Sequence, residues 1–82
     1  MLELQFVNRF TDLTTFKRIP LSWTISSLKN FICKTNKMPI NMLKLSLKVD
    51  ENSGEEEITE DHKTVGYYNV TESSVFFISQ AK

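Results

Sequence analysis

Cysteine, glycine and proline are scarce in this sequence, and no sign of charge is in excess. Its 82 residues include one cysteine, two glycines and two prolines, with ten basic side chains against ten acidic ones. Because Cys33 has no second thiol to join, the chain has to be held together by its core, which fits a reducing compartment such as the cytosol. A balanced charge argues against a dedicated nucleic-acid binder. The length predicts a single small domain over residues 1–82.

Long apolar stretches are also lacking. The longest unbroken run covers residues 75–78, whereas a membrane-spanning helix needs about 20 residues. Residues 1–15 include Glu3, Arg9 and Asp12 and therefore contain no continuous apolar segment of the kind found in secretory signals. We expect no membrane partner and a cytoplasmic location.

Candidate catalytic and metal-binding residues are few. Cys33 and His62 are the only possible pair of nucleophile and base, and they fall on different predicted elements. A single Cys and a single His lack the paired spacing of a zinc site, and the acidic segment 50–60 lacks the residue order of a calcium loop. Gly54 and Gly66 form no phosphate-binding glycine motif. The sequence predicts no enzyme, no metal site and no cofactor.

Two N-terminal segments have the character of β-strands. Residues 2–7 alternate, with Leu2, Leu4 and Phe6 on one face. Residues 14–19 are rich in strand-forming residues, but Phe16 and Ile19 fall on opposite faces, which predicts either a bulge or an exposed Phe16. The polar loop between the segments is short, so we expect a hairpin.

A helix is predicted over residues 25–36, because apolar residues recur there at helical spacing. Thr24 is placed to cap its first turn, and Pro39 follows its end. Residues 43–49 then alternate clearly, with apolar residues at 43, 45, 47 and 49 and with Lys44, Ser46 and Lys48 on the opposite face.

The C-terminal part is less regular. Residues 50–61 hold seven acidic side chains around Ile58, which could anchor a short strand. Residues 62–70 predict a turn of helix and a packed loop, and residues 75–78 a last strand. This order predicts an α+β domain with four to five mixed strands packed on one helix. If the first and last strands lie side by side, the fold is a β-grasp roll.

Several stretches together resemble the ubiquitin-like fold and, more closely, the C-terminal ubiquitin-like domain of the tubulin-specific chaperone E (tubulin-folding cofactor E) family. The ubiquitin-like domain of tubulin chaperone B is also similar. The stretches that carry the resemblance are Ile19-Pro20-Leu21-Ser22-Trp23-Thr24-Ile25, Lys37-Met38-Pro39-Ile40, Tyr67-Tyr68-Asn69-Val70 and Phe76-Phe77-Ile78.

The resemblance implies a non-catalytic, monomeric interaction domain, excised from the C-terminus of a larger cytoplasmic, cytoskeleton-associated protein. Its implied partners are tubulin and other tubulin cofactors, in the assembly and dissociation of the αβ heterodimer and in microtubule biogenesis. An alternative is an adaptor that docks to the proteasome or to ubiquitin receptors. The printed sequence ends without the glycine pair that a conjugated modifier needs, since it closes Ser79-Gln80-Ala81-Lys82.

Charge is distributed unevenly along the chain and suggests a partner surface. Residues 1–49 carry eight basic and two acidic side chains, whereas residues 50–82 carry two basic and eight acidic ones. Lys44 and Lys48 project from one predicted strand, where Lys17 or Arg18 could join them and meet an acidic partner such as a tubulin tail. If Phe76 and Ile78 face the core, alternation places Phe77 on the lysine face. The predicted partner surface is therefore Lys44, Ser46, Lys48 and Phe77; the alternative is that these charges only solvate the sheet and protect its edges.

Overall fold

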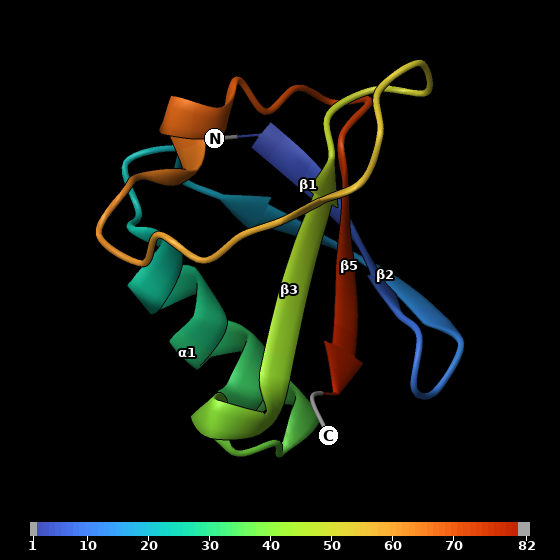
Figure 1. Ribbon diagram of the computed structural model, residues 1–82, viewed down its shortest axis with the longest axis vertical. Coiled ribbons are helices and arrows are strands. Elements are labelled where there is room, and N and C mark those ends of the chain that lie inside the picture. Colours follow the sequence, from blue (N-terminus) through green and yellow to red (C-terminus); the bar gives the residue numbers. More distant parts are fainter. Residues whose placement is uncertain (1, 81–82) are drawn as a thin grey trace.

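The computed structural model describes residues 2–80 (Figure 1). Within them every predicted element is present, including the short strand before Ile58 and the turn of helix after His62. Met1, Ala81 and Lys82 lie outside the described residues, and with them part of the C-terminal sequence that lacks a glycine pair. The elements are β1 (Leu2–Asn8), β2 (Leu13–Ile19), α1 (Ile25–Asn36), the 3-10 turn η1 (Ile40–Met42), β3 (Leu43–Lys48), β4 (Glu56–Glu57), the 3-10 turn η2 (Val65–Tyr68) and β5 (Val75–Gln80).

The strands of residues 2–80 form a single mixed sheet in the order β2-β1-β5-β3-β4. The first and last strands are parallel neighbours at its centre, and the remaining pairs are antiparallel. Figure 1 shows α1 lying across one face of this sheet. The predicted arrangement, with the terminal strands side by side and the helix crossing them, is confirmed. No helix among the described residues is long and apolar enough to cross a membrane.

The N-terminal hairpin pairs without a bulge. Its register runs from Leu2 opposite Ile19 to Asn8 opposite Leu13 with no residue skipped. Regular alternation therefore turns Phe16 away from the core, and its side chain is 58% exposed. Asp12 completes the turn with a positive φ of 59°. Of the two possibilities left open by the sequence, the exposed Phe16 is the one observed.

The core lies between α1 and the sheet face that it covers. The ring of Phe6 on β1 stacks on that of Phe76 on β5, with centroids 5.3 Å apart. Because β1 and β5 are paired, this stack lies where the first and last strands meet in the middle of the core. The buried apolar side chains are Leu4, Phe6, Ile19, Ile25, Leu28, Ile32, Cys33, Leu43, Leu45, Leu47, Ile58, Val65, Val70, Phe76 and Ile78.

The first turn of α1 is held by its cap and by the segment that precedes η2. Thr24 Oγ1 accepts a hydrogen bond from the backbone N–H of Ser27, as predicted. The N–H groups of Ile25 and Ser26 donate to the carbonyls of Lys63 and Asp61. These bonds satisfy helix amides that would otherwise lack partners and fix residues 61–63 beside the start of the helix.

Burial of the β3 leucines predicts a large and specific cost of truncation. Leu45 is 1% exposed, so Leu45→Ala should lower the free energy of unfolding by about 2–5 kcal/mol. Leu13→Ala is the matched control, since Leu13 is 63% exposed, and it should change stability by less than about 0.5 kcal/mol. Urea denaturation monitored by Trp23 fluorescence measures both values. Equal effects of the two substitutions would contradict the burial of Leu45 in the core.

Candidate protein-interaction surface

The sheet face opposite α1, here called the outer face, is not covered by any helix of residues 2–80. Strand register defines its members: side chains that alternate with the core positions of β1, β2, β3 and β5 all point to this side. They include the predicted surface residues of β3 and β5. The outer-face residues of these strands are Glu3, Gln5, Val7, Thr14, Phe16, Arg18, Lys44, Ser46, Lys48, Val75, Phe77 and Ser79.

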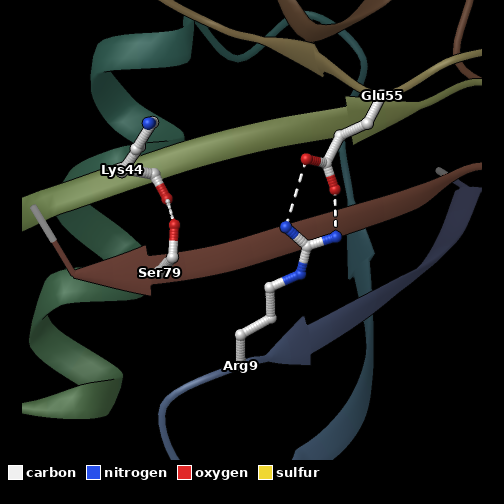
Figure 2. Close-up of polar contacts among 4 residues, drawn as sticks. All are labelled: Arg9, Lys44, Glu55 and Ser79. Carbon is white, nitrogen blue, oxygen red and sulfur yellow. Dashed lines mark hydrogen bonds and ion pairs between the residues drawn. The ribbon is translucent and has the colours of Figure 1, made fainter.

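Phe77 lies on the outer face, as predicted, but under the side chain of Arg9. The guanidinium carbon of Arg9 is 4.1 Å from the centroid of the Phe77 ring, which is a cation–π contact. Figure 2 shows the Arg9 side chain reaching across β5 to the carboxylate of Glu55. Both carboxylate oxygens of Glu55 accept hydrogen bonds from the guanidinium, one of them at 3.1 Å. Phe77 is therefore half-buried beneath the Arg9 guanidinium, which in turn is bonded to the Glu55 carboxylate.

Ser46 is a correction to the predicted surface. Ser46 lies on the outer face, between Phe77 on β5 and Glu57 on β4, but it is only 5% exposed. A short side chain between two larger cross-strand neighbours is shielded from solvent, which alternation alone cannot reveal. Ser46 can shape the surface between its neighbours, and it offers a partner almost no contact area.

Lys44 and Lys48 both project from the outer face but differ in their surroundings. The Lys44 ammonium is 3.8 Å from a carboxylate oxygen of Glu57, and its backbone carbonyl accepts a hydrogen bond from the Ser79 hydroxyl at 3.2 Å (Figure 2). Within residues 2–80 no carboxylate is paired with Lys48, which lies in the cross-strand row of Val75. Lys48 is thus the less compensated cation of the two.

The two β2 cations that could join the lysine surface, Lys17 and Arg18, lie on opposite faces of the sheet. Arg18 pairs with Glu3 in the register and shares the outer face, whereas Lys17 pairs with Leu4 and points to the side of the sheet where α1 lies. Sequence reasoning left both open and missed Arg9 and Glu55 altogether. These two residues are 46 positions apart, and only the sheet topology brings them together.

Cys33 and His62 are not brought together. Cys33 is buried in the third turn of α1, whereas His62 is exposed and belongs to the segment bonded to the first turn. The eight residue steps from Ile25 to Cys33 span about 12 Å of helix. Burial raises the pKa of the Cys33 thiol, and nearby Lys29 opposes this only in part. Among the described residues, no group of three or more His, Cys, Asp or Glu side chains could hold a metal ion.

The sheet topology, the helix across one face and the open outer face define a β-grasp domain. The family model for the ubiquitin-like domain matches residues 1–79, so the chain belongs to the family of ubiquitin-like domains. Members of this family are typically non-catalytic. A search of curated protein sequences found no match to the chain.

Solved structures of similar fold include domains of tubulin cofactors. The C-terminal ubiquitin-like domain of mouse tubulin-specific chaperone e has a TM-score of 0.87 at 20% identity, over 99% of this chain and 87% of that one. Tubulin-binding cofactor B of Trypanosoma brucei gives 0.85 at 21% identity, over 99% and 95%. The N-terminal ubiquitin-like domain of tubulin-binding cofactor B from Drosophila melanogaster gives 0.82 at 12% identity, over 98% and 84%. At these identities the likeness shows the fold.

The environment of Cys33 predicts an unreactive thiol in the folded protein. Because burial raises its pKa, less of the nucleophilic thiolate is present at neutral pH, and the remaining fraction is shielded. A chromogenic disulfide reagent at pH 7.5 should modify Cys33 slowly in buffer and rapidly in concentrated urea. The reaction should accelerate as the pH rises toward the raised pKa. Equal rates in the folded and unfolded protein would show that the thiol is accessible.

Proposed function

We propose that this ubiquitin-like domain is the non-catalytic protein-interaction domain of a tubulin-folding cofactor. On this proposal it binds α-tubulin through its outer face and serves in the assembly and dissociation of the αβ heterodimer, in the cytoplasm and on the cytoskeleton. The observation that carries the proposal is the placement of Phe77 beneath Arg9 with Lys44 and Lys48 on the neighbouring strand. The likeness to the domains of tubulin-specific chaperone e and tubulin-binding cofactor B supports the choice of partner.

An acidic tail of tubulin suits this surface in two ways. Its carboxylates can approach Lys44 and Lys48, and they can replace Glu55 as the acceptor for Arg9. The exposed Arg9–Glu55 pair contributes about 0–1 kcal/mol, so a partner displaces it at low cost. Displacement of Arg9 uncovers Phe77, which then serves as an aromatic anchor. Electrostatic attraction would speed the encounter and weaken as salt is added.

Charge reversal on β3 tests this surface. The double substitution Lys44→Glu with Lys48→Glu should weaken binding of purified αβ-tubulin at low salt, while the free energy of unfolding stays within about 0.5 kcal/mol, because both side chains lie outside the core. Fluorescence anisotropy of the labelled domain measures the affinity.

The matched control is Lys34→Glu with Lys63→Glu, which makes the same change in net charge at residues of α1 and of the loop before η2. This control should bind tubulin as the unaltered domain does. An equal loss in both double variants would show that net charge, not the outer face, governs binding. Unchanged binding by Lys44→Glu with Lys48→Glu would refute the surface.

The ion pair between Arg9 and Glu55 gives a second prediction. Glu55→Gln removes the competing carboxylate, so a synthetic acidic peptide with the composition of a tubulin tail should bind more tightly. Stability should change by less than about 1 kcal/mol, because the pair is exposed. Glu51→Gln, in the same acidic segment, is the control and should leave the affinity unaltered. A weaker complex with Glu55→Gln would show that the partner contacts Glu55 itself.

A titration of the ¹⁵N-labelled domain separates this proposal from the adaptor alternative. Added αβ-tubulin should perturb the amides around Arg9, Lys44 and Lys48. The resemblance to ubiquitin implies an apolar binding patch at Ser46, Phe77 and Ser79, and Phe77 takes part in both modes. A ubiquitin receptor that shifts Ser46 and Ser79 but neither Arg9 nor Lys48 would favour docking to the proteasome or its receptors. The burial of Ser46 and the cover over Phe77 leave little exposed apolar area for that second mode.

A further inference from the structure

The sheet has two edges, and only one of them is open over a long stretch. In the described chain the strand order ends in β2 on one side and in β4 on the other. β4 consists of Glu56 and Glu57 alone, a short charged edge that discourages pairing. β2 has seven residues, and six of them are exposed. Its register contains no bulge, and no proline occurs before Pro20. Edge strands with these properties are available for pairing with another chain.

The backbone direction identifies the unpaired groups of β2. The Arg9 N–H, directly after β1, donates to Ile78 of β5, so odd-numbered residues of β1 turn their backbone groups toward β5 and even-numbered ones toward β2. Leu4 and Phe6 consequently bond with Lys17 and Thr15 in the register. The N–H and C=O groups of the alternate β2 residues point outward. These outward-facing residues are Thr14, Phe16 and Arg18.

Side chains on both faces of β2 remain available for contact. Phe16 on the outer face is 58% exposed, and Leu13 on the helix side is 63% exposed. A shallow cleft of about 20 Å³ runs between β2 and α1, lined in part by Thr15, Phe31 and Thr35. The cleft is too small for a small-molecule ligand. A strand laid along β2 would contact its rim on one face and Phe16 on the other.

The basic side chains that form no ion pair within the described chain indicate the kind of partner. The ion pairs of residues 2–80 use Arg9, Lys29 and Lys44 of the basic N-terminal half. Lys48 and four other cations of that half form no ion pair in the described chain, and those four lie on β2 or at the C-terminal end of α1. Neither element carries an acid, although Glu3 of β1 lies opposite Arg18 in the register. The four are Lys17, Arg18, Lys34 and Lys37.

We propose that the open edge of β2 binds an extended, acidic segment of a partner protein by β-strand addition. The outward groups of Thr14, Phe16 and Arg18 form the main-chain hydrogen bonds, and the unpaired cations select Asp and Glu beside the apolar residues of the incoming strand. A second copy of this chain fits less well, because β2 has no acidic side chain to place beside Lys17 and Arg18 of the strand that it would pair with. The proposal concerns a surface separate from β3 and does not depend on tubulin as the partner.

The probe for this site is a synthetic ten-residue peptide with a central run of four Val and Ile residues flanked by Asp and Glu. In a titration of the ¹⁵N-labelled domain it should shift the amides of residues 13–19 and of Phe31 and Thr35, with the outer-face amides of β3 unmoved. The same peptide with proline at two central positions loses the donors of a strand and should not bind.

Variants of β2 separate the backbone contribution from the side chains. Phe16→Pro removes an outward N–H without breaking the ladder to β1, and it should weaken the peptide complex about tenfold or more, which one or two lost hydrogen bonds and the lost ring explain. Phe16→Ala, which retains the N–H, is the matched control and should lose less. Lys17→Glu with Lys34→Glu should also weaken binding, whereas Lys48→Glu should not.

Two results would overturn the proposal. One is unchanged affinity in both Phe16→Pro and Lys17→Glu with Lys34→Glu; the charge variant decides the matter if the proline variant fails to fold. The other is a set of shifts confined to β3 and β5, which would place the peptide on the outer face. Concentration-dependent dimerisation through residues 13–19 without peptide would assign the edge to a second copy and also contradict an acidic partner.

Discussion

The parallel pairing of β1 with β5 is the contact on which the rest of this structure depends. It places Phe6 against Phe76 at the centre of the core and makes these strands the inner members of the sheet. With them in place, α1 has an apolar surface to cover on one face, and β3 has a neighbour on its β5 side. The opposite face then becomes the outer face, and β2 becomes an edge. Both proposed binding surfaces are consequences of this one pairing.

The strands and the helix were predictable where a periodic pattern is repeated several times. Apolar and polar residues alternate three times over residues 43–48, and residues 25–36 combine helical spacing with a capping threonine. In both segments the local pattern therefore agrees with the structure that forms. The two-residue β4 was only hinted at by Ile58, because a pair of glutamates has no strand signal of its own.

The candidate surface was predictable in part. Alternation correctly placed Lys44, Lys48 and Phe77 on one face. It could not show that Ser46 is shielded by its cross-strand neighbours, because shielding depends on which strands pair and in which register. Nor could it show that Arg9 covers Phe77, since the contact joins residues distant in sequence. Sequence patterns identify the face of a residue, whereas its accessibility is decided by packing across strands.

The placement of β5 also bears on how this domain forms during synthesis. Residues 75–80 are translated late but occupy the middle of the sheet. Until they leave the ribosome, β1 and β3 lack the strand that lies between them, and Phe6 and the β3 leucines lack their neighbours on β5. Domains that fold only when distant strands meet are slow to form and prone to aggregate in the interval. Chaperones that shield apolar segments would therefore act on this chain up to its final strand.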